Sequence, residues 1–343
     1  MTSKDLGRKA FSRNELYLFL VIFVMSLVLF FFNRDFATFE NLFDILRSYS
    51  FMGIMAVGVL VVLLSGGIDI SFTAIATVAQ YIMAIFLARY KGFSPALALA
   101  IPLVIGTALG AVNALIIYYL RAPAIIVTIA TLNLFYGVLV FLSGGKWIYS
   151  FPAWFRNFAK INVVHFINRE GILYGFSILT AIWAGIVIFS LVLLNYTTLG
   201  RKVYAMGSNI EAAKRVGINI FGLQLFVYSF MGFLSGLASI IQALLAQTVA
   251  PNAIMGRELD VIAAVVLGGA SLFGGEGTLL GTLLGVALIA VMGNGLTLMR
   301  VSAYWHNVAI GLIIIISVSI TALQRKMASR KTVAVNIDER IIQ

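Results

Sequence analysis

The few side chains that could do chemistry in this sequence stand beside or inside long apolar runs. Asp69 directly follows one such run, in the segment Gly66-Gly67-Ile68-Asp69-Ile70-Ser71. An ionisable side chain at membrane depth is costly and usually functional. An acid just before a helix can instead cap it, because it pairs with free amides and with the positive end of the helix dipole. We favour the cap for Asp69, and direct contact with a solute is the alternative.

Neutral amide side chains lie inside several apolar runs, and glycines interrupt two of the runs. Each of these residues has an ordinary role in close helix packing and in hydrogen bonds between helices. Paired segments interrupted by glycine are also the sequence feature that indicates a translocation path. The candidates for the path or its helix breaks are Gly66, Gly67, Asp69, Ser71, Asn113, Asn133, Gly268, Gly269, Gly274, Gly275 and Asn294.

The sequence offers no catalytic residue, metal site or cofactor motif. It lacks the G-x-x-x-x-G-K-[ST] phosphate loop, the G-x-S-x-G nucleophile elbow and the H-E-x-x-H zinc motif. It has no cysteine, and His165 and His306 are too far from each other and from carboxylates to indicate a metal centre. If ATP drives this protein, another chain must bind it.

The composition of the chain indicates the environment in which these residues lie. The chain has 343 residues, of which 61% are hydrophobic and 11% charged, with a mean hydropathy of +1.03. Soluble domains carry about 25% charged residues. We therefore expect an integral membrane protein in contact with lipid. The net charge of +11 does not indicate nucleic acid, because the basic residues lie between and beyond the apolar runs, as the positive-inside rule requires.

Apolar runs near the length that spans a bilayer predict helices, because backbone polar groups must pair internally in lipid. We predict an all-α protein with about ten spans. They are Leu16–Phe32, Phe51–Ser65, Phe72–Ala88, Leu97–Tyr119, Ala124–Leu142, Ile172–Leu194, Leu223–Gln247, Leu259–Phe273, Leu279–Met299 and His306–Leu323. An interfacial helix is expected at Asn41–Ser48, outside the cell.

The distribution of charge predicts a multi-pass membrane protein with both termini in the cytoplasm. Residues 1–323 form one transmembrane domain, and residues 324–343 form a cytoplasmic tail. Spans two to five and spans seven to ten each contain a short helix that ends in glycines, and the two groups start from opposite sides. This arrangement predicts an inverted four-helix repeat with short broken helices.

One polar stretch between apolar runs, Leu199–Gly222, predicts a short cytoplasmic helix. Ser208 and Glu211 fit a capping box, and Gly217 stands where a left-handed C-cap residue belongs. We expect this stretch to be a docking element. The side chains that would couple it to a partner are Ser208, Asn209, Glu211, Ala212, Ala213, Lys214, Arg215 and Gly217.

Three stretches together resemble the membrane permease subunits of ribose- and galactose-type sugar ABC importers. They are Leu64–Ser71 (LSGGIDIS), the loop from Leu199-Gly200-Arg201 through Gly207-Ser208-Asn209 to Gly217-Ile218, and Glu258–Gly269 (ELDVIAAVVLGG). The resemblance runs in order over nearly the whole chain. It departs from the family pattern after Ser71, where Phe72-Thr73 replaces a Val-Gly pair, so we expect that helix start to pack differently.

The resemblance implies a homodimer, or a heterodimer with a similar permease, bound to two cytoplasmic ATP-binding subunits. It also implies a periplasmic or lipid-anchored binding protein that delivers the solute, and it matches the segment Ser208–Gly217 to the coupling region that meets the ATPase. We therefore expect the transmembrane subunit of an ATP-driven importer of a small sugar or sugar-like solute. Permeases for autoinducer-2 or nucleosides, an ion-coupled secondary transporter, and a membrane scaffold or enzyme are the alternatives.

Overall fold

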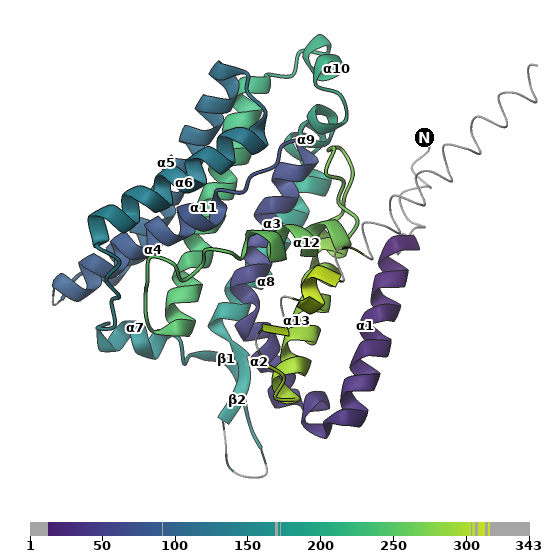
Figure 1. Ribbon diagram of the computed structural model, residues 1–343. Helices are drawn as coiled ribbons and strands as arrows, with labels where there is room; N and C mark the ends of the chain where they lie inside the picture. Colours follow the sequence, from purple (N-terminus) through teal and green to yellow (C-terminus); the bar gives the residue numbers. More distant parts are fainter. Residues whose placement is uncertain are drawn as a thin grey trace, which may run out of the picture.

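The computed structural model describes residues 13–90, 92–168, 171, 173–302, 304, 305, 308–312 and 315 of the chain. The predicted tail, 324–343, and most of the predicted tenth span, His306–Leu323, lie outside the described residues. The described part is a bundle of helices that run broadly between two ends of the molecule (Figure 1).

Seven helices are long and apolar enough to cross a membrane, which confirms a multi-pass, mostly helical membrane protein. They are α1 (Arg13–Phe32), α4 (Phe72–Arg89), α5 (Pro95–Leu120), α6 (Ala124–Ser143), α8 (Ile178–Tyr196), α11 (Ile220–Ala246) and α13 (Leu279–Leu298). The predicted count of ten and the inverted repeat stay predictions, because only these seven described helices qualify on their own.

Two of the predicted spans are shorter than a membrane crossing. The second is α3 (Ser50–Leu64), which has 15 residues and meets the amphipathic helix α2 (Phe39–Ser48) at an angle of 50°. The eighth was predicted as Leu259–Phe273, but α12 (Glu258–Leu267) has only 10 residues. At about 1.5 Å per residue, α12 covers roughly half of the hydrocarbon core. It ends at Gly268, and Gly269 then takes a left-handed backbone with φ +93°.

α2 confirms that the residues predicted to form a helix at 41–48 are helical, and their position at the membrane interface stays a prediction. A short 3₁₀ turn (η2, Arg34–Ala37) precedes it, and the Thr38 hydroxyl accepts a hydrogen bond from the Asn41 amide at 3.3 Å.

The connection after α6 is the one described segment that departs from the predicted all-α fold. This connection holds a short helix, α7 (Ala153–Phe158), and an antiparallel hairpin of β1 (Asn162–Ile167) and β2 (Leu173–Ser177). β2 takes the residues that were predicted to open the sixth span, so α8 begins at Ile178. The strands are rich in β-branched and aromatic residues, which favour a pleated surface. Phe166 and Tyr174 pair across the hairpin, with ring centroids 5.7 Å apart. The hairpin lies at the end of the bundle opposite α9 and α10 (Figure 1).

The core surrounds α3, in which every residue except Phe51 is buried. α8, α9, α11, α12 and α13 all contact it. α11 also packs closely along α5, because glycines face each other where the two helices cross. A Cβ atom on Gly106 would collide with the carbonyl of Gly232, and one on Gly236 would collide with the carbonyl of Pro102. Small residues of this kind let two helix backbones approach closely in a membrane protein.

Candidate functional site

The polar stretch Leu199–Gly222 forms two short helices where the sequence predicted one. α9 spans Thr198–Ser208 and α10 spans Ile210–Arg215. α9 begins because the Thr197 hydroxyl accepts a hydrogen bond from the Gly200 amide at 3.2 Å. Both helices lie together at one end of the bundle (Figure 1).

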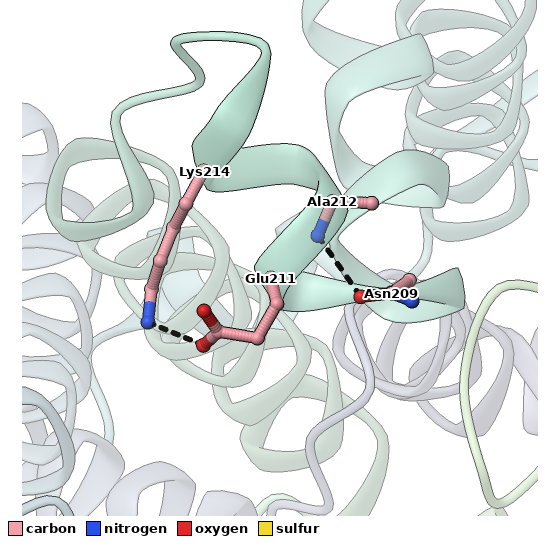
Figure 2. A network of polar contacts seen from close by, with 4 residues as sticks. All are labelled: Asn209, Glu211, Ala212 and Lys214. Atoms are coloured by element: carbon pink, nitrogen blue, oxygen red, sulfur yellow. Dashed lines mark hydrogen bonds and ion pairs between the residues drawn. The ribbon is translucent and has the colours of Figure 1, made fainter.

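The predicted capping box is wrong by one residue. Asn209 caps α10, since its Oδ1 accepts a hydrogen bond from the Ala212 amide at 3.0 Å (Figure 2). Asn209 has the extended backbone that an N-cap needs, with φ −162°, whereas Ser208 still belongs to α9 and donates its hydroxyl to the Tyr204 carbonyl at 2.9 Å. Glu211 does not reach back to Ser208, because its carboxylate pairs with Lys214 Nζ at 2.7 Å (Figure 2).

The predicted end of this helix is confirmed. Gly217 has φ +82°. The Ile218 amide donates to the Ala213 carbonyl at 3.1 Å, and the Gly217 amide donates to the Lys214 carbonyl at 3.0 Å. These two bonds form a Schellman motif, which satisfies carbonyls that the helix end would leave free. Ala213 is buried, so α10 is anchored on one side and presents Glu211, Ala212, Lys214 and Arg215 on its exposed side.

The C-terminal end of α9 lies between the two glycine-rich helix breaks. We call the four residues Gly66, Gly207, Gly274 and Gly275 the glycine junction. A Cβ on Gly207 would collide with the Leu64 carbonyl and lie 2.8 Å from the Gly275 nitrogen. A Cβ on Gly274 would lie 2.6 Å from Gly66 Cα and 2.7 Å from the Gly207 oxygen. Three backbone segments from distant parts of the sequence therefore touch with no side chain between them.

Hydrogen bonds hold the glycine junction together. The Gly275 amide donates to the Leu64 carbonyl at 3.1 Å, which joins the break after α12 to the end of α3. The Tyr204 hydroxyl, on α9, donates to the Gly277 carbonyl at 2.9 Å. Burial raises the pKa of Tyr204, so this phenol keeps its proton at neutral pH. α9 is thus hydrogen-bonded to the break after α12, which is itself hydrogen-bonded to the end of α3.

Asp69 lies between the end of α3 and the start of α4, and only 2% of its surface is exposed. Its Oδ1 accepts the Ser71 amide at 2.8 Å and the Ser71 hydroxyl at 2.6 Å. Asp69 does not cap α4 as predicted: Ser71 is the residue at the N-cap of α4, and the amide that Asp69 binds is that of Ser71, before the first turn of the helix. Asp69 is also enclosed by protein, whereas the cap interpretation had it at the inner membrane interface.

Three other helices contact the α3–α4 break. Asn113 of α5 donates from Nδ2 to the Ser71 hydroxyl at 2.7 Å. Thr128 of α6 donates to the Ile68 carbonyl at 3.2 Å. The Tyr228 hydroxyl of α11 lies against Gly67, where a Cβ would collide with it. The structure therefore brings Asp69, Ser71 and Asn113 together, as residues of one buried network.

The remaining candidates lie elsewhere. Asn133 is exposed on α6, and its amide nitrogen bonds the Ile129 carbonyl of its own helix at 2.8 Å. Asn294 forms a reciprocal amide pair with Asn41, at 3.0 and 2.8 Å, which joins α13 to α2. A Cβ on Gly268 would lie 2.6 Å from the Thr282 nitrogen, so this glycine lets α12 approach α13.

Sequence reasoning missed Gly207, Tyr204, Tyr228 and the pair formed by Thr73 and Glu258. The Thr73 hydroxyl donates to the Glu258 carboxylate, which is 7% exposed, and this links the starts of α4 and α12. Glu258 carried a signal as an acid directly before an apolar run, and both Glu258 and Gly207 stand in the stretches that resemble the permease family. Among the described residues, no three His, Asp or Glu side chains gather into a metal site.

Comparisons with known proteins agree on one family. The family model described as "Branched-chain amino acid transport system / permease component" matches residues 41–318. The chain is similar to the ribose import permease protein RbsC of Escherichia coli (strain K12), with 34% identity over 83% of this chain and 86% of that protein. RbsC of Haemophilus influenzae is 33% identical over 89% of this chain and 91% of its own. The autoinducer 2 import system permease protein LsrC of Yersinia pestis (strain Pestoides F) is 31% identical over 82% of this chain and 77% of its own. No solved structure matches the chain.

Proposed function

Because the chain belongs to the family of branched-chain amino acid transport system permease components, we propose that it is the transmembrane subunit of an ATP-driven importer of a small sugar or sugar-like solute. The ribose and autoinducer-2 permeases to which it is similar support this solute class. The chain is a transport subunit and no enzyme, and ATP hydrolysis takes place on a separate chain.

The glycine junction is the observation that carries this proposal. A coupling element must move the spans when a partner moves it, and flexible side chains would absorb part of the displacement. At this junction the α9 backbone touches the backbone of both helix breaks without side chains between them. Movement of α9 and α10 is therefore passed to the α3–α4 break and to the break after α12 together, as in rigid-body domain transitions.

In the proposed assembly, α9 and α10 face the cytoplasm of a bacterium and receive the ATP-binding subunits. The exposed charges of α10, Glu211, Lys214 and Arg215, meet the ATPase. The hairpin end faces outward, toward the binding protein. Residues 1–323 form the permease domain, with both termini in the cytoplasm, and a second permease subunit completes the path.

The solute is proposed to be an uncharged polar molecule. The described spans contain few charged groups, which fits a sugar better than an ion or a zwitterion. Autoinducer-2 and nucleosides share this polarity and stay alternative solutes. Gly66, Asp69 and Ser71 at one break, with Gly274 and Gly275 at the other, are the residues through which opening of the path would be controlled.

Reconstitution tests the proposal. The chain is purified with the ATP-binding subunits and the exported binding protein encoded in neighbouring genes, and the complex is placed in liposomes. We expect binding protein loaded with one of ribose, galactose, a nucleoside or autoinducer-2 to raise ATP hydrolysis and solute uptake. Uptake by the purified chain alone, driven by a sodium or proton gradient without ATP, would instead show an ion-coupled secondary transporter.

A further inference from the structure

We propose that the buried network at the α3–α4 break binds a small monovalent cation, with Na⁺ as the ion to test. The site consists of Asp69, Ser71, Asn113 and Tyr228, which we call the Asp69 cluster. These residues come from the break itself, from α5 and from α11. None of them is more than 2% exposed.

The hydrogen bonds inside the Asp69 cluster leave three of its oxygen atoms without a hydrogen-bond partner among the described residues. The Ser71 hydroxyl serves as both donor and acceptor, since it donates to Asp69 Oδ1 at 2.6 Å and accepts from Asn113 Nδ2 at 2.7 Å. Asp69 Oδ2, Asn113 Oδ1 and the Tyr228 hydroxyl have no hydrogen-bond partner among the described residues. A buried polar atom without a partner is unfavourable, so three such oxygens in one cluster of contacting residues call for a ligand.

The groups that carry these oxygens are joined through Ser71 and the backbone of the α3–α4 break. Asp69 Oδ2 and Asn113 Oδ1 each belong to a group that is hydrogen-bonded to the same Ser71 hydroxyl. The Tyr228 hydroxyl lies against Gly67, two residues before Asp69, and the Asp69 carboxylate acts on it electrostatically.

Charge decides the class of ligand. Asp69 makes no ion pair with any described Lys, Arg or His, and the pair of Lys214 with Glu211 is the one found in the described part of the chain. An uncompensated carboxylate inside a membrane protein is strongly unfavourable. The cluster offers oxygen atoms only, which suit a hard cation, and a single carboxylate balances a single positive charge.

The backbone adds to the site. α3 ends at Leu64, and the negative end of its dipole points toward the break. Ends of broken helices and unwound carbonyls are the groups that coordinate Na⁺ in other membrane transporters. The cation would connect the α3–α4 break to α5 and α11. Because Asp69 lies three residues after Gly66 of the glycine junction, the bound cation would also stiffen the segment that α9 moves.

Binding of radioactive sodium to the purified, detergent-solubilised chain tests the inference. We expect one ion per chain and a higher melting temperature in sodium chloride than in N-methyl-D-glucamine chloride of equal ionic strength. Asp69→Asn should lose both effects. No saturable sodium binding by the wild-type chain, or unchanged binding by the Asp69→Asn protein, would overturn the proposal.

Tyr228→Phe keeps the test decisive if Asp69→Asn does not fold. If the Tyr228 hydroxyl contacts no ion, Tyr228→Phe only removes a buried hydroxyl that lacks a hydrogen-bond partner. The sodium affinity of the protein then stays unchanged. If the hydroxyl is a ligand, the sodium affinity of Tyr228→Phe falls at least severalfold. Tyr81→Phe is the control, because Tyr81 is similarly buried and its hydroxyl bonds the Lys146 carbonyl outside the cluster. Its sodium affinity should equal that of the wild type, and a loss there would equally contradict the proposal.

The site is independent of the proposed function. An ATP-driven importer without a cation site would still hydrolyse ATP in response to a loaded binding protein. A cation site in a protein that needs no ATP would leave the sodium-binding result intact and remove only the importer proposal.

Discussion

Gly207 is the residue of the glycine junction that stands on α9, and the contact there depends on its lack of a side chain. Its backbone lies against Leu64 and Gly275, and a single added methyl group would collide with the Leu64 carbonyl. The obstacle is backbone, which cannot turn aside as a flexible side chain would. Any larger residue must therefore push α9 away from one or both helix breaks.

We expect Gly207→Ala to uncouple the importer. The protein should still insert and fold, but transport in the reconstituted complex should fall about tenfold, equivalent to about 1.4 kcal/mol of lost coupling. ATP hydrolysis without solute and solute uptake are measured on the same liposomes. Gly185→Ala on α8 is the matched control, since a Cβ there meets nothing within 4 Å. Equal transport by both variants would contradict the role of the junction.

Asn209 gives a second prediction for a single residue. Its side chain holds the first turn of α10, so Asn209→Ala should destabilise this helix by about 1 kcal/mol. Trypsin cleavage after Lys214 or Arg215, both exposed, reports the opening of α10. We expect cleavage about fivefold faster, because 1 kcal/mol changes the open population by that factor.

Ser208→Ala distinguishes this cap from the one that the sequence favours. The Ser208 hydroxyl bonds only the Tyr204 carbonyl among the described residues, within α9, so its loss should leave cleavage at α10 nearly unchanged. If Ser208→Ala speeds cleavage and Asn209→Ala does not, Ser208 is the cap of α10, as the sequence predicted, and the assignment of Asn209 is wrong.

At the scale of elements, the crossing of α5 and α11 positions the α3–α4 break. Asn113 stands on α5 and Tyr228 on α11, and both contact the break. Gly106 and Gly110 on α5 face the backbone of α11 directly. The spacing between these helices therefore sets where the break residues lie.

Gly232→Val should force these helices apart. Overpacking of this kind costs roughly 1–3 kcal/mol, which corresponds to a fall in melting temperature of several degrees. Gly137→Val on α6 makes the same chemical change where a Cβ meets nothing within 4 Å. Thermal unfolding followed by tryptophan fluorescence compares the two. Equal melting temperatures would show that the helices do not approach as closely as the structure has them.

At the scale of the whole molecule, the two ends of the bundle carry different elements. α9 and α10 occupy one end, and α7 with the β-hairpin occupies the other (Figure 1). The proposed function requires the first end in the cytoplasm and the second outside.

Single introduced cysteines test this orientation. The chain itself has no cysteine, so a thiol reagent labels only the introduced residue. Val216→Cys beside α10 and Ile167→Cys in the hairpin are suitable, with 77% and 66% of those side chains exposed. A membrane-impermeant maleimide applied to intact cells should label Ile167→Cys only, and permeabilised cells should label both. Labelling of Val216→Cys in intact cells would show that α10 faces the outside, which would contradict the proposed orientation.

The sequence by itself determined the class of protein and most helix positions. The apolar runs predicted α4, α5, α6, α11 and α13 to within a few residues, because lipid requires every span to satisfy its backbone internally. Gly217 was also predictable, since a left-handed C-cap depends on the local chain alone. The motifs around Asp69, Ser208 and Glu258 indicated the permease family before any contact was known.

Only the tertiary structure decided which residues meet. The hairpin was missed because β2 lies at the start of the apolar run that was predicted as the sixth span, Ile172–Leu194. Asn113 joins Asp69 while Asn133 and Asn294 do not, and the sequence treats all three as amides inside apolar runs. Gly207 looks like any loop glycine until α9 is seen against both breaks. Such contacts join segments far apart in the chain, so they depend on how whole helices pack, and the local forces that form each helix do not specify them.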